Sequence, residues 1–143
     1  MSKVFAAIKD EQLNYNWLIT DCMCYPKNVN HDELLSKEYA WLTGKELTQI
    51  VEIEDFQWIW AVLSGFPKNV ALEEVLKYNL PYADGYRGFW EYTLSIQHPL
   101  ADIEIVPWDS SLVLAISRKD IIVDNFMNYF PLAQNLTTYN SNS

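Results

Sequence analysis

The sequence predicts an α+β protein: a mainly antiparallel sheet of about five to seven strands, with three or four helices packed on it. Apolar runs of strand length recur along the chain, and most of them are joined by connections too short for parallel crossovers. Apolar residues at helical spacing occur in only a few short segments, and most of these follow a capping signal. We therefore expect an antiparallel sheet with its helices on one face.

The strands are expected where apolar residues alternate with polar ones or form short continuous runs. Residues 56–63 are the most hydrophobic stretch, which indicates a central buried strand, closed by Gly65 and Pro67. Residues 90–97 show the clearest alternation, and we expect this strand to pair with the one that begins near Asp102. The expected strands cover residues 4–9, 17–25, 39–42, 56–63, 90–97, 103–106 and 112–116.

The first two of these strands are expected to pair as a hairpin, and so are the last two, on either side of a turn at residues 109–111. Pro107 removes a backbone donor and should close its strand or sit at its edge. The continuous apolar run over residues 112–116 is typical of a strand that is covered on both faces.

Helices are expected after capping signals and where apolar residues recur every three or four positions. Thr43 and Glu46 have capping-box spacing and predict a helix that ends near Glu52. A looser box at residues 117–120 predicts a helix that stops before Pro131. Shorter helices are expected over residues 30–37 and 72–76, and a loop over residues 79–88.

The chain is expected to form one domain over residues 1–143, with a polar tail that is disordered from about residue 137. Half of the 143 residues are hydrophobic and 15% are aromatic, including six tryptophans, which argues against disorder elsewhere. Every apolar run in the sequence is shorter than a membrane span, and the first residues lack the apolar core of a signal peptide. We expect a cytoplasmic protein.

Acidic residues outnumber basic ones, 19 to 10, which gives a formal net charge of −9. This balance disfavours nucleic acid as a partner, because affinity for nucleic acid comes largely from lysines and arginines that neutralise phosphates. It equally disfavours anionic membrane surfaces. A basic protein partner is compatible with the charge, since complementary potentials speed and orient encounter.

The sequence offers weak candidates for chemistry, and we expect no catalytic residue, metal or cofactor. Cys22 and Cys24 share a strand face, but a zinc site needs about four ligands and only His31 and His98 could complete one. Buried small apolar side chains account better for the two cysteines. The serines of the 109–111 turn lack the strand–turn–helix context of a hydrolase nucleophile.

Carboxylates gather in two groups, one at residues 52–55 and one at residues 102–109. Solvated acidic faces are the simplest interpretation, an acidic surface that binds another protein is the second, and a catalytic carboxylate pair is the third. Trp108, flanked by Pro107 and Asp109, is the tryptophan expected to be exposed, although capping a core edge is equally compatible. The candidate partner-binding residues are Glu52, Glu54, Asp55, Asp84, Asp102, Glu104, Trp108 and Asp109.

Two phrases of the sequence carry a resemblance. EDFQWIWAVLSGFPK at residues 54–68, and the ending PWDSSLVLAISRKD, YFPLAQNL and YN, are similar to phrases in small, acidic, aromatic-rich bacterial immunity proteins of contact-dependent or polymorphic toxin systems. The resemblance implies a non-enzymatic inhibitor that binds and occludes a cognate toxin domain, often a nuclease. It carries over no individual site residue.

Two other functions remain open from the sequence alone. A small hydrolase-like enzyme would use paired carboxylates in one cleft, and would show two close carboxylates of perturbed pKa in a deep pocket. A homodimeric adaptor would pair two copies through exposed aromatic residues.

Overall fold

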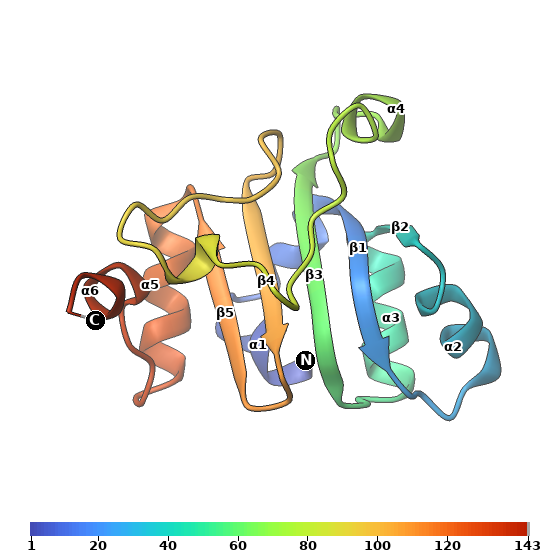
Figure 1. Cartoon of the computed structure of the whole chain (residues 1–143). Helices are drawn as coiled ribbons and strands as arrows, with labels where there is room; N and C mark the ends of the chain where they lie inside the picture. The colour runs from blue at the N-terminus through green and yellow to red at the C-terminus, as the bar shows by residue number, and fades with distance from the viewer. Residues whose placement is uncertain (143) are drawn as a thin grey trace.

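The computed structural model describes residues 1–142, which form a single five-stranded antiparallel sheet (Figure 1). The strand order is β2-β1-β3-β4-β5, so the two longest strands, β1 and β3, pair with each other and β2 and β5 form the edges. The predicted α+β class is confirmed, and the strand count lies within the expected range. The strands are β1 (Tyr15–Cys24), β2 (Tyr39–Thr43), β3 (Trp58–Pro67), β4 (Ile103–Trp108) and β5 (Leu112–Ser117).

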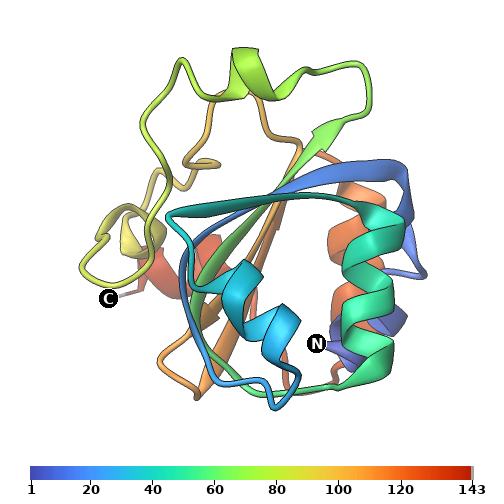
Figure 2. The ribbon, with the colours of Figure 1, turned by 90° about the vertical axis from the view of Figure 1, so that its right-hand side faces the viewer.

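Six α-helices accompany the sheet in residues 1–142, rather than the three or four that the sequence predicted. Three of them, α1, α3 and α5, cover one face of the sheet (Figures 1 and 2). The other face is covered by the long connection over residues 68–102 and by the C-terminal helix. The helices are α1 (Ser2–Ala7), α2 (Val29–Leu35), α3 (Gly44–Ile53), α4 (Leu72–Val75), α5 (Asp120–Tyr129) and α6 (Leu136–Ser141), with short 3-10 turns η1 (Glu11–Asn14) and η2 (Gly88–Trp90).

The main core lies between the sheet and these three helices. The sheet contributes Trp17 and Ile105, α3 contributes Leu47, and all three side chains are fully buried in one cluster. The predicted capping box of α3 is confirmed: Thr43 accepts a hydrogen bond from the Glu46 N–H at 3.1 Å, and Glu46 accepts one from the Thr43 N–H at 2.9 Å. This cap satisfies two backbone donors at the helix start and fixes where α3 leaves β2.

Gly65 does not end β3, as the sequence predicted, but lies within it. A Cβ atom at this position would lie 2.5 Å from Ile103 Cγ2 and 3.0 Å from the Trp17 ring. Gly65 therefore makes room for the side chains of the two flanking strands, which is the role of glycine at a close approach inside a strand.

The predicted strand at residues 4–9 is wrong, because residues 4–7 belong to α1 and residues 8–9 form the turn that follows it. Val4 and Ile8, four residues apart, both lie in the core cluster together with Phe5. That spacing places side chains on one side of a helix. The strand was predicted because Val4, Ala6 and Ile8 alternate with Phe5, Ala7 and Lys9, but this run is too short to separate the strand period from the helix period.

The predicted strand at residues 90–97 is also wrong, because this segment contains the end of η2 and irregular backbone. Both edges of β4 are already occupied, by β3 and β5. Trp90, Leu94 and Ile96 instead pack down onto the sheet as part of its cover. Their alternation reflects one side of a covering segment.

The C-terminal segment, predicted to be disordered from about residue 137, forms helix α6. Asn135 caps this helix by accepting a hydrogen bond from the Thr138 N–H at 3.0 Å. Asn140 is buried and donates through Nδ2 to the carbonyls of Phe89 and Glu91, at 3.0 and 2.9 Å. The last residue of the predicted tail, Ser143, lies outside the described residues. Within residues 1–142, no helix has the length and apolar character needed to cross a membrane.

Candidate partner-binding site

The carboxylates of the first acidic group are largely engaged within the protein. Glu54 accepts hydrogen bonds from the backbone N–H groups of Lys27 and Asn28 at 2.9–3.1 Å. These bonds, led by the one from Lys27, hold the Glu54 pKa below its ordinary value. Glu52, by contrast, is an exposed residue of α3.

Asp55 joins the start of the chain to the start of β3. Its carboxylate accepts from the N-terminal ammonium of Met1 at 3.0 Å and from the Ser2 N–H at 3.2 Å, and the Ser2 hydroxyl also donates to it. Partial burial raises the Asp55 pKa, but the bonds from Ser2 and the N-terminus outweigh it, so the pKa lies below its ordinary value. Reversing the charge at Asp55 would therefore disturb the fold as well as any surface.

Glu104, which the sequence offered for a partner surface, lies inside the protein with 0% of its surface exposed. Oε1 accepts from the Gln97 N–H at 2.7 Å and Oε2 from the His98 N–H at 3.3 Å. Burial raises the Glu104 pKa to about 7, against the opposing effect of these bonds. Glu104 thus fastens the connection over residues 68–102 to the middle of the sheet, and its carboxylate is not available to a partner.

His98 is held in the same buried region and is also committed to the backbone. Its Nε2 lies 2.9 Å from the Val75 carbonyl, and its Nδ1 lies 3.1 Å from the Leu100 nitrogen. Because Nδ1 accepts from an N–H, the proton sits on Nε2 and the ring is neutral. Burial holds the His98 pKa below its ordinary value. His98 and the serines of the 109–111 turn lie at opposite ends of β4, so they form no nucleophile–base pair.

The remaining predicted residues lie at separate places. Asp84 is exposed in the connection, where its N–H and that of Ala83 donate to Asp21 at 3.1 and 2.9 Å. Asp102 is half-buried just before β4, and Asp109 is exposed after its other end. The eight candidates therefore do not form one acidic patch.

Trp108 is half-buried, and its ring packs edge-on against Trp60 and Trp90 at centroid distances of 4.8 and 5.1 Å. It caps an edge of the smaller core on the face away from the three helices. Of the two roles considered from the sequence, the structure shows the cap.

Cys22 and Cys24 are both free thiols, with their Sγ atoms 3.5 Å apart at the irregular end of the β1–β3 pairing. The hydrogen bond with Cys24 and burial together raise the Cys22 pKa, whereas the same bond lowers the Cys24 pKa. No group of three or more histidine, cysteine or acidic residues that could hold a metal occurs in residues 1–142.

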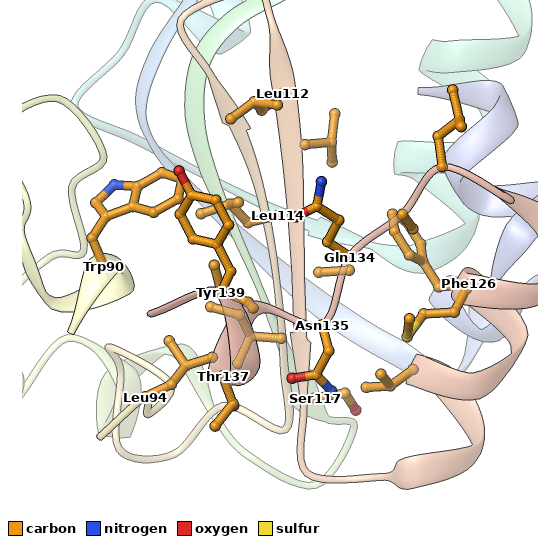
Figure 3. A pocket seen from close by; sticks show the side chains of 18 residues that line it. Trp90, Leu94, Leu112, Leu114, Ser117, Phe126, Gln134, Asn135, Thr137 and Tyr139 are labelled. Carbon is orange, nitrogen blue, oxygen red and sulfur yellow. The ribbon is translucent and has the colours of Figure 1, made fainter. Parts of the chain in front are cut away.

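A groove runs along β5, on the edge that pairs with no other strand (Figure 3). We call it the β5 groove; its volume is about 440 Å3. Among the described residues, none that lines it carries a charge, although a fifth of the whole chain is charged. Its lining comprises Trp90, Leu94, all of residues 112–117, Val123, Phe126, Met127, residues 132–137 and Tyr139.

The groove is bridged by a segment that we call the strap, residues 130–135, which leads from the end of α5 to the start of α6. The strap carries the chain around the free edge of β5, from the helix-covered face to the other face (Figures 1 and 3). Within residues 1–142, no hydrogen bond joins residues 130–142 to β5. Beyond the strap, Asn140 anchors helix α6 through its hydrogen bonds to the carbonyls of Phe89 and Glu91.

Exposed apolar side chains surround the groove. Leu132 on the strap is 93% exposed, Tyr139 of α6 is 52% exposed, and Leu112 and Val113 at the start of β5 are 50% and 38% exposed. The sequence predicted that β5 would be covered on both faces, which is wrong at the start of the strand, where Leu112 and Val113 are exposed. The apolar run also gave no indication that β5 lies at an edge of the sheet. One signal was present: from Asn125 to Ser143 the sequence contains no Asp, Glu, Lys or Arg.

Comparisons with known proteins add no further identification. No protein-family model matches the chain, and neither a curated protein nor a solved structure matches it. The resemblance to immunity proteins therefore stays a prediction from sequence phrases.

Proposed function

We propose that this protein is an immunity-type inhibitor that binds a cognate bacterial toxin domain and occludes it. The observation that carries the proposal is the β5 groove: a hollow, uncharged, apolar surface with exposed Leu112, Val113 and Leu132 at its border, on a chain of net charge −9. Contiguous exposed apolar surface of this kind marks a site of protein–protein contact. The sequence resemblance supplies the class of partner.

Exposed acids lie close to groove residues in the sequence, and a basic partner would contact them; one exposed base, Arg118, also follows a groove residue. Asp109 lies on the hairpin just before β5, Asp124 follows the groove residue Val123, and Glu91 follows Trp90; all three acids are exposed. Interfaces combine an apolar centre with a polar rim. Here the rim acids would steer a basic toxin, and the uncharged groove would hold it.

The buried ionisable groups support binding rather than catalysis. The carboxylate of Glu104 and both ring nitrogens of His98 are bonded to the protein's own backbone. A raised pKa in a carboxyl group is often a mark of an acid–base catalyst, but the backbone bonds that surround Glu104 give its position a structural role. The hydrolase alternative has no specific observation in its favour.

Co-expression tests the proposal. The chain is produced together with the toxin-like domain encoded beside its gene, and cell growth and complex formation are measured. We expect growth to be rescued and a one-to-one complex to be isolated. If the domain kills the cells with or without this protein and no complex forms, the proposed function is wrong.

The contribution of the acids beside the groove can be measured on the same complex. Reversing two acids beside the groove, Asp109→Lys with Asp124→Lys, should lower the association rate about tenfold and weaken its salt dependence, because these charges steer encounter. The control is Glu33→Lys with Glu38→Lys, which changes net charge equally on exposed residues of and beside α2. Equal loss in both variants would show that only total charge matters.

A further inference from the structure

We propose that the β5 groove takes an extended, uncharged strand of the toxin partner, which adds to the free edge of β5 beneath the strap. This inference rests on the proposed function and specifies how the partner is held. The occupant is defined by chemistry: a peptide segment in β conformation with apolar side chains and no charge.

The first observation is that β5 presents an open and regular edge. It pairs with β4 in an unbroken register of six residue pairs, from Ile103 with Ser117 to Trp108 with Leu112. Proteins usually protect a sheet edge with a charged residue, a proline or a bulge. The β5 sequence Leu-Val-Leu-Ala-Ile-Ser has none of these. Its edge is shielded only by the strap, which makes no hydrogen bond to it within the described residues.

The second observation is that six consecutive residues of β5 line the groove. Successive side chains of a strand point to opposite faces of the sheet. A groove that touches all of them must follow the backbone edge, where the outward N–H and C=O groups lie. A strand placed about 4.8 Å away can bond to those groups.

The third observation is that both sides of this edge are apolar. On one side, Leu114 and Ile116 cluster with Trp90. On the other side, α5 contributes Phe126 and Met127 to the groove. An added strand would place alternate side chains on these two sides, so both sets must be apolar and uncharged to be accepted.

The strap distinguishes a single strand from a second copy of this chain. Pairing β5 with β5 of another copy would bring two straps into the same space, since each passes around its own edge. Two copies would also bring together chains that each carry a net charge of −9. A single extended segment needs only the space between one strap and β5. Gln134, on the strap beside that space (Figure 3), is exposed and its amide can bond to the outer edge of the added strand.

The test combines one substitution with its matched control. Val113→Lys places a charge at the β5 edge, whereas Val29→Lys makes the same change on α2, where Val29 is 77% exposed. We expect Val113→Lys to weaken binding of the toxin domain at least tenfold and Val29→Lys to leave it unchanged. Far-ultraviolet circular dichroism confirms that both variants are folded.

Hydrogen–deuterium exchange on the unaltered protein gives a second measurement that needs no variant. Strand addition should slow exchange of the β5 amides that point away from β4 at least tenfold when the toxin domain is bound, because only these gain a hydrogen-bond partner. A complex that forms and rescues growth without this protection, and that tolerates Val113→Lys, would refute strand addition while leaving the proposed function intact.

A blocked peptide probes the groove without the toxin. We would titrate Ac-Gly-Val-Ala-Val-Ala-Val-Gly-NH2 and a counterpart with lysine at the central valine, following the same β5 amides. Protection by the first peptide alone supports the inference even if the chosen toxin domain proves not to be the partner. No protection by either peptide or by a bound toxin overturns it, as does a dimer by light scattering that Val113→Lys abolishes.

Discussion

The two faces of the sheet are held by different kinds of interaction. On the face covered by α1, α3 and α5, large apolar side chains such as Trp17, Leu47 and Ile105 interlock in one cluster. On the other face, two smaller apolar clusters that include the fully buried Leu18, Phe66 and Phe89 lie under a long irregular connection. Buried hydrogen bonds, chiefly those of Glu104 and Asn140, fasten this face. The difference teaches that regular helices and apolar packing close the first face, whereas the second also depends on buried polar groups.

The largest expected effect comes from breaking the helix-covered core. Trp17 is fully buried, and its Nε1–H donates to the Gln12 carbonyl at 2.9 Å. Trp17→Ala should lower the free energy of unfolding by about 3–5 kcal/mol, because it leaves a large cavity and removes a buried hydrogen bond. Urea unfolding followed by circular dichroism measures this. Tyr25→Ala, at a position 73% exposed, should change the free energy of unfolding little. A loss as large as that of Trp17→Ala would show that stability does not depend on the helix-covered core.

The second face can be tested through the pH dependence that Glu104 confers. Burial raises the Glu104 pKa from an ordinary value of 4.5 to about 7 in the folded protein. The folded state therefore binds more protons between these values, and stability should fall as pH rises from about 4.5 to above 7. The difference between the two pKa values corresponds to about 3 kcal/mol of unfolding free energy.

Glu104→Gln removes this titration, so the change in unfolding free energy between pH 4.5 and 7.5 should be less negative in the variant than in the unaltered protein. Paired urea titrations across that range provide the measurement, and the difference between the two proteins cancels the other acids, including Glu54 and Asp55. Parallel pH profiles would show that Glu104 does not titrate in this window.

The smallest expected effect comes from loosening helix α6, which follows the strap. Asn140→Ala removes the side-chain bonds to the Phe89 and Glu91 carbonyls and should cost about 1–2 kcal/mol. Amides of α6 should exchange faster, while those of α3 should not. The matched control is Asn142→Ala, which truncates an exposed residue. If Asn140→Ala, like the control, leaves the exchange of α6 amides unchanged, Asn140 does not anchor α6.

Local signals predicted much of the architecture. The Thr43–Glu46 box predicted the start of α3, and the hydrophobic run at residues 56–63 predicted a strand in the middle of the sheet, since each depends on neighbours in sequence. The strand prediction for residues 90–97 was wrong because alternation of apolar and polar residues is compatible both with a strand and with a segment that covers a sheet. Which one forms depends on whether β4 has a free edge, and that is decided elsewhere in the chain.

The candidate site was harder to predict because its properties are set by distant contacts. Glu54 is engaged by backbone near residue 27, and Asp55 by the first residues of the chain. The residues next to Glu54 and Asp55 in the sequence do not indicate that these carboxylates accept hydrogen bonds within the protein. The β5 groove likewise depends on the path of the strap around an edge, which no periodicity encodes. Only the absence of charge after Asp124 indicated that this end of the chain differs from the rest.

The position of the strap has a consequence for truncated chains. β5 ends at Ser117, whereas the strap and α6 follow over residues 130–141. A chain that stops between these elements has the strand but not the segment that shields its edge, and uncovered edges template aggregation. Removal of residues 130–143 should therefore lower the yield of soluble protein, whereas removal of residues 142–143 alone should not.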